Sequence, residues 1–591
     1  MSSKNQPLQL LNVLKNHQRG LRQEYDVFLS KLGSPNITSE ELKSYIKSLR
    51  DCITFLDKDH EILVGVLLKV DWTRREPDVV MEYQTLLHNL VSAHTYYLRA
   101  GLRMLVKHFV PKIPENAMVS SSDSIVLDNQ QIQAHETSFI NVHLVIKAIA
   151  NIVPMSPTVL LPLLSDYFPY MTKDKYIQEC YVKNLLQITH YMPQQRLAIL
   201  ELIVDRMLKL DVRSPKHEIA EAEDQMEEDN DIIFDMDDPN TTQDIQSPDA
   251  GYRSGGRFEL ESAKPMNHKE AERLDVMMYL VLKYIQQTCF NDGQLKWEDT
   301  KKLYRELLLV FERLILPTYA SCHVQFIMFT LCAMKQPICE GFVDFLWKKV
   351  QDPNTEAVYR QASVSYIGSL LSRGLFVPIS TVMACLGLMC DWIHKYLDQV
   401  GTCVQADVSH HGPFYSVCQT VFYVFVFRSK ELLEMKKGYK WAEGLNFQRV
   451  VTSRLNPLRV CMPVIVKSFA SVTRTHQLAF CDTIIERNNR CFLPSSTGKG
   501  EVLLDAFPFD PYILHRSRRF ITSHYREYQG NVVQDDNDSE DEEDDFITDE
   551  IVSPKDSIPV SIGKTPTDFM AYSVSPGFKQ TTLEWPQSME G

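Results

Sequence analysis

The feature that most constrains this chain is a long succession of helix-length segments with apolar residues along one side. The clearest example runs from Leu346 to Leu375, LWKKVQDPNTEAVYRQASVSYIGSLLSRGL. A turn at residues 352–354 ends one helix, and the second helix then repeats apolar side chains at the spacing of a single buried face. These side chains are Val358, Ala362, Tyr366, Ile367, Leu370 and Leu371. Segments of similar length fill most of the chain before Arg526, so the pattern predicts an all-α protein.

The turn and the hydrophobic-x-Arg-x-Ala start of the second helix, at 358–362, resemble the second half of a HEAT repeat. In such repeats the arginine, here Arg360, links neighbouring hairpins; the alternative for this segment is one ordinary helical hairpin. A chain of 591 residues exceeds the size at which a single core stops growing. Stacked helical pairs extend without a thickening core. We therefore predict a HEAT-repeat-like α-solenoid of antiparallel helical pairs.

Composition divides the chain into four regions. We expect N-terminal HEAT-like repeats at 1–212 with a serine-rich loop at 111–136, a disordered acidic insert at 213–267, C-terminal HEAT-like repeats at 268–530, and a disordered tail at 531–591. Thr38 with Glu41 has the pattern of a capping box. The helical pattern at 77–110 is long enough that a break is expected near Ala100-Gly101.

The acidic balance of the chain comes from two short runs. Residues 217–250 contain thirteen Asp or Glu and residues 531–550 contain eleven, with no Lys or Arg in either run. Without these carboxylates the formal net charge changes from −14 to +10. The favoured interpretation is solubilising disorder, and the alternative is competition of the acidic runs for a basic surface.

No catalytic constellation is recognisable. Gly498-Lys499-Gly500 lacks the spacing of a phosphate-binding loop, and no nucleophile elbow occurs. Cys385, Cys390 and His394 share a predicted helix at spacings that suit buried apolar residues better than a zinc site. The thirteen cysteines form no CxxC pair, and the polar N-terminus has no signal peptide. We predict a reduced, intracellular, non-enzymatic protein without cofactors, metals or a membrane span.

A small basic cluster is the one candidate for nucleic-acid contact. Its arginines alternate with Phe520, Tyr525 and Tyr528, which is compatible with stacking on bases. The cluster consists of Arg516, Arg518, Arg519 and Arg526. A dedicated binder usually shows a broad basic face, so direct DNA contact is a weak hypothesis. An intramolecular clasp between these arginines and the following acidic run is at least as good an interpretation.

Several longer stretches resemble the RNA polymerase I-specific transcription initiation factor family known as TIF-IA in animals. They are HGPFYSVCQTVFYVFVFRSKELL (411–433), LNFQRVVTSRLNPLRVCMPVIV (445–466), CDTIIERNNRCFLP (481–494), LPTYASCHVQFIMFTLC (316–332) and LHNLVSAHTYYLRAGLRMLVKHFVP (87–111). The resemblance implies a HEAT-repeat solenoid without enzymatic activity, located in the nucleus and nucleolus. It also implies that the protein bridges the stalk side of RNA polymerase I to the promoter-bound selectivity complex.

The resemblance further implies control by protein kinases. Within IVPMSPTVLLPLL, Ser156 falls at a regulated, polymerase-facing position of the family. From the residues themselves, Ser539 precedes three acidic residues, the context of an acidophilic kinase, while Ser553, Thr565 and Ser575 each precede proline. The rival hypothesis is a helical-repeat nuclear transport adaptor, although the tryptophan-asparagine ladder of peptide-binding armadillo grooves is absent.

Overall fold

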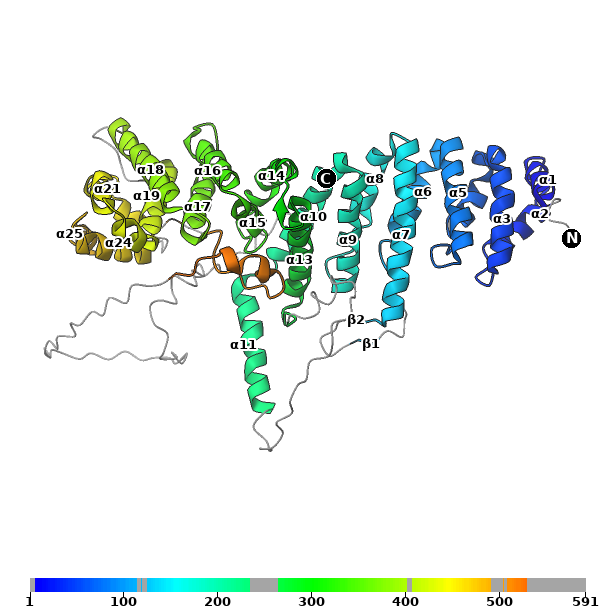
Figure 1. Cartoon of the computed structure of the whole chain (residues 1–591), viewed down its shortest axis with the longest axis horizontal. Coiled ribbons are helices and arrows are strands. Elements are labelled where there is room, and N and C mark those ends of the chain that lie inside the picture. The colour runs from blue at the N-terminus through cyan, green and yellow to red at the C-terminus, as the bar shows by residue number, and fades with distance from the viewer. Residues whose placement is uncertain are drawn as a thin grey trace, which may run out of the picture. The chain divides into compact units, whose positions relative to one another are not determined.

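The computed structural model describes residues 6–113, 118–119, 125–233, 264–400, 407–490, 503 and 507–528. These residues form an all-α array of HEAT-like helical pairs (Figure 1), which confirms the predicted fold class. The strands in this described part are two short antiparallel pairs. They are β1 (Met118–Val119) with β2 (Ile125–Val126), and β3 (Phe290–Asn291) with β4 (Gln294–Leu295). Among the same residues, no helix combines the length and apolar content needed to cross a bilayer.

The first compact unit, unit 1, comprises residues 1–314 together with 514–517. Its helices are α1 (Gln6–Gln18), α2 (Gln23–Leu32), α3 (Ser39–Asp51), α4 (Glu61–Leu67), α5 (Pro77–Ala93), α6 (Leu98–Lys107), α7 (Asn129–Ile152), α8 (Ser156–Asp166), α9 (Lys175–Tyr191), α10 (Arg196–Asp211), α11 (Lys216–Ile233), α13 (Lys269–Cys289) and α14 (Trp297–Val310). Short 3₁₀ turns lie between some of them: η1 (Ile53–Phe55), η2 (Lys58–His60), η3 (Thr95–Tyr97) and η4 (Pro193–Gln195).

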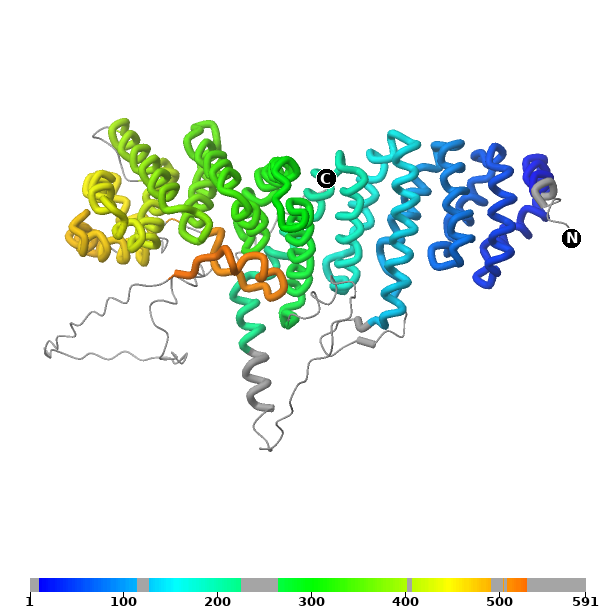
Figure 2. Tube along the Cα trace, viewed as in Figure 1, coloured from blue at the N-terminus to red at the C-terminus, as the bar shows by residue number. Residues whose placement is uncertain are grey.

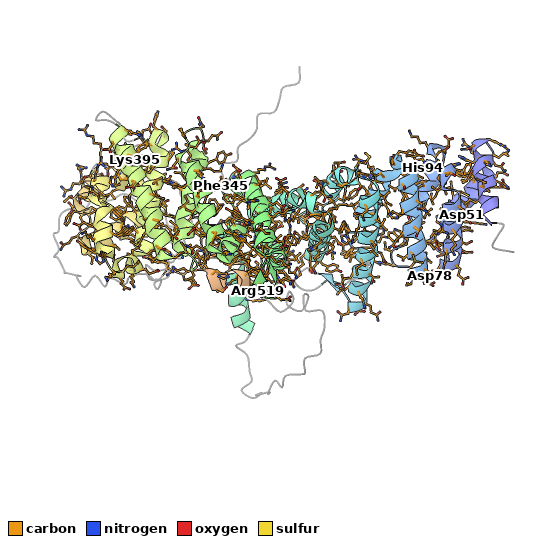
Figure 3. The ribbon with its side chains drawn as sticks, turned by 45° about the horizontal axis from the view of Figure 1, so that its top comes forward. Asp51, Asp78, His94, Phe345, Lys395 and Arg519 are labelled. Carbon is orange, nitrogen blue, oxygen red and sulfur yellow. The ribbon has the colours of Figure 1, made fainter. Side chains whose placement is uncertain are left out.

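Alternate helices of unit 1 pack side by side, which is the arrangement expected of stacked hairpins. One row consists of α1, α3, α5, α7, α9 and α13, each packed against the next (Figure 1). Opposite it, α2 packs on α4, α6 on α8, α8 on α10, and α10 on α14. Ion pairs tie successive helices of the first row, as between Lys43 of α3 and Asp78 at the start of α5, which are 2.7 Å apart. Figure 3 labels Asp78.

Local capping accounts for several helix boundaries in unit 1. The Thr38 hydroxyl accepts from the Glu41 N–H at 3.3 Å, and the Glu41 carboxylate accepts from the Thr38 N–H, so the predicted capping box is present. The expected break near Ala100-Gly101 is wrong. The chain instead breaks at the turn η3, after α5 ends at Ala93, where Tyr97 donates a hydrogen bond to the Asp57 carbonyl at 2.6 Å.

The loop predicted at 111–136 is shorter than expected. Helix α7 already begins at Asn129, because the Gln131 side chain accepts a hydrogen bond from the Asp128 N–H at 3.2 Å and caps the helix start. The buried Ile132 and His135 then lie on the inner face of this first part of α7. Residues 120–124, which carry the clustered serines, lie outside the described residues.

The disorder predicted for 213–267 is wrong for its first part, where α11 spans Lys216–Ile233. Its first turns are held by Ile219, which is buried, and by Glu223, whose carboxylate accepts from the Asn267 N–H at 2.8 Å. Residues 234–263 and 529–591, the remainder of the predicted acidic insert and the tail, lie outside the described residues.

The second compact unit, unit 2, comprises residues 315–513 and 518–591. Its described helices are α15 (Phe326–Met334), α16 (Gln336–Gln351), α17 (Ala357–Arg373), α18 (Ile379–Gln399), α19 (Val408–Phe427), α20 (Ser429–Glu434), α21 (Gly438–Gly444), α22 (Phe447–Val451), α23 (Pro457–Val460), α24 (Pro463–Thr475) and α25 (Asp482–Arg490). The boundary at 314–315 falls inside the region 268–530, because α13 packs against α9 and α10 of unit 1.

Helix α19 is the centre of unit 2. Every residue from Gly412 to Val426 is buried, as expected of a helix that is apolar all round. It packs against α17, α18 and α24. The contact with α17 is close because Gly368 has no side chain there; a Cβ at this position would lie 2.7 Å from the Thr420 Cγ2.

Residues 507–513 and 518–528 complete the described part of unit 2 with short turns instead of helices (orange in Figure 2). The Phe509 ring packs against Phe326 and Phe329, with ring centroids 5.4 and 5.2 Å away. Its N–H donates to the Ser369 hydroxyl at 2.9 Å. This irregular segment therefore supplies part of the core of unit 2.

Candidate interaction surfaces

Ser156 lies at the first position of α8, followed by Pro157, as the sequence pattern predicts. Its side chain is turned into the protein, with a residue exposure of 1%. The hydroxyl has no hydrogen-bond partner among the described residues. Ser156 is therefore not part of the surface of the folded protein, and a kinase reaches it only when α8 opens locally.

The four arginines of the predicted basic cluster do not form one basic surface. Arg516 is buried, whereas Arg518 and Arg519 are exposed on the turn η6 (Ser517–Phe520), where Figure 3 labels Arg519. Arg526 is half-buried, and its guanidinium pairs with Glu431 at 2.6 Å. Arg516 and Arg526 already have carboxylate partners within the chain, which weakens the case for nucleic-acid contact through this cluster.

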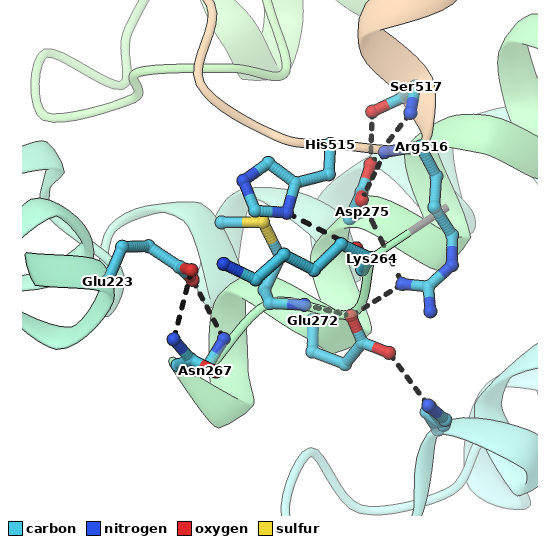
Figure 4. A network of polar contacts seen from close by, with 10 residues as sticks. Glu223, Lys264, Asn267, Glu272, Asp275, His515, Arg516 and Ser517 are labelled. Carbon is cyan, nitrogen blue, oxygen red and sulfur yellow. Dashed lines mark hydrogen bonds and ion pairs between the residues drawn. The ribbon is translucent and has the colours of Figure 1, made fainter. Parts of the chain in front are cut away.

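Arg516 belongs to a buried polar network in unit 1 (Figure 4). Its guanidinium pairs with the carboxylate of Glu272 on α13. The same carboxylate accepts from Lys175 Nζ at 2.8 Å and from the Met266 N–H at 2.8 Å. Burial opposes ionisation of Glu272, but the bonds and charges of Arg516 and Lys175 outweigh it and lower its pKa below the usual value.

Asp275 lies one turn further along α13 and is fully buried. Its carboxylate accepts from the Arg516 N–H at 2.7 Å, from the Ser517 N–H at 2.9 Å and from the Ser517 hydroxyl. Burial dominates and raises the pKa of Asp275, although these hydrogen bonds favour the charged form. The two carboxylates and one guanidinium form a closed structural network. In the sequence, the one sign of this network is that Glu272 and Asp275 lie three residues apart, on one buried face of α13.

The candidate metal residues are the buried Cys390, the half-buried Cys385 and His394. Burial raises the pKa of both Cys385 and Cys390 to about 12, which keeps the thiols protonated. His394 Nε2 hydrogen-bonds the Leu445 carbonyl at 3.0 Å instead of facing the two cysteines. Within the described residues no group of three or more metal-ligating side chains converges. These residues serve packing in unit 2.

A groove of about 620 Å³ runs between α7 and α9 in unit 1. Its floor includes Phe139 and Tyr191, and Ile140 and Leu144 on α7 line it while being 61% and 53% exposed. Glu136 lies toward the beginning of α7 and Lys147 toward its end. The groove therefore combines an apolar strip with charges of opposite sign, which suits an amphipathic segment of a protein partner.

The wall of this groove is rigid because His143 joins its two helices. His143 Nε2 donates to the Asn184 side-chain oxygen at 2.9 Å, and Nδ1 accepts from the Tyr191 hydroxyl at 2.9 Å. Burial lowers the pKa of His143 to about 4, so the imidazole is neutral and one tautomer satisfies both bonds. The sequence pattern does not reveal the groove or the hydrogen bonds of His143, because both depend on residues from different helical hairpins.

Comparison with known proteins identifies the family. The model of the family described as RNA polymerase I specific transcription initiation factor RRN3 matches residues 5–532. A Mus musculus protein named RNA polymerase I-specific transcription initiation factor RRN3 is 39% identical over 594 residues, covering 95% of this chain and 88% of its own length. A Schizosaccharomyces pombe protein of the corresponding name is 26% identical, over 86% of this chain and 83% of its own length.

A solved structure has the same fold. The crystal structure of RNA polymerase I transcription initiation factor Rrn3 superposes with a TM-score of 0.68 at 18% sequence identity, covering 89% of this chain and 99% of that one. This likeness supports the helical-repeat architecture, and the family match and the murine relative carry the assignment. The chain belongs to the RRN3 family of RNA polymerase I-specific transcription initiation factors.

Proposed function

We propose that this protein binds RNA polymerase I, on the stalk side of the enzyme, and bridges it to the promoter-bound selectivity complex so that ribosomal RNA synthesis begins. It acts in the nucleus, within the nucleolus, without catalysing a reaction. The observation that carries the proposal is the family match over residues 5–532. Helical repeats fit a bridging role because stacked repeats offer long surfaces to protein partners.

Affinity purification tests the proposal against its rival. A tagged full-length chain is expected to co-purify the large subunits of RNA polymerase I together with subunits of the promoter selectivity complex. A nuclear transport adaptor would instead co-purify a transport GTPase or carriers of basic localisation peptides. Retention of transport factors in place of polymerase subunits contradicts the proposal.

The groove between α7 and α9 is the surface that we assign to the polymerase side. Its exposed Ile140 and Leu144 present apolar area that a partner would remove from water, at about 25 cal/mol per Å². Residues at the centre of an apolar contact carry most of the binding free energy. The charged residues at the two ends of the groove then set the orientation of the bound segment.

Ile140→Asp combined with Leu144→Asp is expected to weaken polymerase binding by roughly 100-fold, because two central apolar contacts are replaced by charges. Both side chains are exposed, so folding of the variant should be unaffected. The matched control is Ile62→Asp, a side chain 67% exposed on α4 and outside the groove. The affinity is measured by titrating purified polymerase I. Equal affinities for the groove variant and the control would remove this surface from the interface.

Phosphorylation of Ser156 is proposed to act by opening the start of α8, since the hydroxyl is buried. A phosphate adds a charge of about −1.5 to −2, which does not fit an enclosed site. The other proposed acceptors, Ser539, Ser553, Thr565 and Ser575, lie outside the described residues. Mass spectrometry of protein from cells tests whether protein kinases modify each of the five positions.

Ser156→Asp is expected to destabilise α8 by about 2 kcal/mol, because the cost of a buried charge exceeds its attraction to the helix N-terminus. Ser156→Ala should be neutral or slightly stabilising, since it removes a buried hydroxyl that has no partner among the described residues. Hydrogen exchange at the amides of α8 measures the difference, and a pull-down with polymerase I reports its effect on docking. Equal exchange in both variants would contradict the burial argument.

A further inference from the structure

A second groove, of about 880 Å³, lies in unit 2 where α20, α21 and α24 meet. Lys430 of α20 and Lys467 of α24 stand on its walls together with Ser471 and His476. The aromatic rings of Tyr439 and Tyr528 border the same hollow. Such a combination of ammonium groups, hydroxyls and tyrosine rings suits an acidic peptide segment. We call it the lysine groove.

The lysines of this groove have no carboxylate partner among the described residues. Lys430 and Lys467 are exposed, and neither forms an ion pair there. Lys436, Lys437 and Lys440 add three exposed cations in the segment that connects to and begins α21.

Neighbouring carboxylates are mostly engaged elsewhere. Glu431 binds both Arg428 and Arg526, at 2.9 and 2.6 Å, and Asp482 pairs with Arg474 at 3.7 Å. Glu434 is the acidic residue that lines the groove. The balance of unpaired charge at the lysine groove is therefore positive.

The described chain ends at this groove. The Tyr528 ring packs at a tilt against Phe427 of α19, with ring centroids 5.1 Å apart. Arg526 is fixed by its N–H, which donates to the Arg373 carbonyl at 2.7 Å, and by its ion pair with Glu431. The position from which the tail departs is thus determined by contacts within unit 2.

The acidic run of the tail begins at Asp535, seven residues after Tyr528. Seven residues span at most about 25 Å when extended, so the carboxylates at 535–550 begin within reach of the lysine groove. Eleven acidic residues and no Lys or Arg occupy 531–550. A short tether of this kind gives an effective concentration on the order of millimolar, which favours binding within one chain over binding between chains at micromolar protein concentration.

We propose that the acidic run at 535–550 binds intramolecularly in the lysine groove of unit 2. The basic partner of the tail is then this set of lysines and not the arginine cluster at 516–526, where Arg516 and Arg526 already have carboxylate partners. A partner that needs the lysine groove has to displace the tail first.

Zero-length carbodiimide cross-linking of the full-length chain at low salt tests the proposal. Amide links are expected between Lys430 or Lys467 and carboxylates of 535–550, within one chain. A mixture of isotope-labelled and unlabelled protein distinguishes links within a chain from links between chains. The proposal would be overturned if most of the links joined two different chains. It would also be overturned if Lys395, an exposed lysine of α18, were linked as often as Lys467.

Two full-length variants make the test specific. Lys430→Glu with Lys467→Glu should reduce links from 535–550 to Lys436, Lys437 and Lys440 of the neighbouring segment roughly tenfold, whereas Lys395→Glu should leave them unchanged. Replacing the eleven Asp and Glu residues of the run with Asn and Gln should raise the rate of hydrogen exchange at the backbone amides of α24, because the uncharged tail no longer covers the groove. If the groove serves nucleic acid instead, no tail links form and a single-stranded RNA binds equally to the wild-type and amide chains; that result would also refute the proposal.

Discussion

Replacing Arg516 with methionine is expected to lower the free energy of unfolding of unit 1 by about 3–5 kcal/mol at neutral pH. Methionine keeps much of the apolar stem but leaves Glu272 without its guanidinium, inside the protein. Lys175 still reaches one oxygen of that carboxylate and does not replace the buried charge. Removing one partner of a buried ion pair costs folding free energy because the other charge stays buried away from water. Hydrogen exchange at the amides of α13 measures the effect in unit 1 specifically.

The loss should depend on pH in a defined direction. In the wild type the pKa of Glu272 is lowered by folding, so its stabilisation is present above the unfolded pKa and is lost as the pH falls through the folded pKa. Without Arg516, burial raises the folded pKa of Glu272, and protonation then favours the folded state. The difference in stability between the two chains should therefore shrink as the pH falls from about 7 to about 5.

Two controls separate this electrostatic account from a packing defect. Arg518→Met changes an exposed arginine two residues away and should alter stability by less than about 0.5 kcal/mol. Adding Glu272→Gln to Arg516→Met should restore part of the lost stability, because it removes the unpaired charge. A loss that is independent of pH and unrelieved by Glu272→Gln would contradict the role given to this network.

Phe509→Ala is expected to destabilise unit 2 by about 3–5 kcal/mol, although Phe509 lies in a segment without helix. The ring is fully buried, and Phe326, Phe329 and Tyr366 surround it, with ring centroids 5.2–5.6 Å away. Removing it leaves a cavity among aromatic rings that belong to two helices. Faster hydrogen exchange in α15 and α17 would report the loss. The control is Phe480→Ala, whose side chain is 60% exposed and should change stability little; equal effects of the two changes would contradict this account.

Periodicity in the sequence predicts the helical array because each hairpin buries the same kind of apolar face. The capping pattern at Thr38 is a local signal, and the structure contains it. The predicted apolar stripe of α17 is buried from Tyr366 to Leu371, but its first member is not, because Val358 lies in the first turn of the helix and is 66% exposed. The acidic composition of residues 216–233 predicts disorder, whereas the structure has helix α11 there. The acidic residues of α11 stay compatible with a helix, because one buried side chain, Ile219, and one carboxylate, Glu223, dock its first turns on unit 1.

Contacts between distant residues account for what the sequence does not reveal. Asp275 and Ser517 are 242 positions apart and meet in one hydrogen-bonded network, so Arg516 has the sequence context of an exposed basic cluster and the surroundings of a core residue. Ser156 likewise has the local pattern of a kinase site, while its burial depends on packing that periodicity does not describe. The groove lined by Ile140 and Leu144 exists only once α7 and α9 lie side by side.

We propose above that this helical-repeat chain enables RNA polymerase I to start at its promoter. The most direct measurement is specific transcription from a ribosomal DNA promoter by purified polymerase I and selectivity complex, with and without the full-length protein. We expect correctly initiated transcripts only when the protein is added, with no change in transcription from a tailed template that needs no promoter. Equal promoter-specific transcription in its absence would contradict the claim.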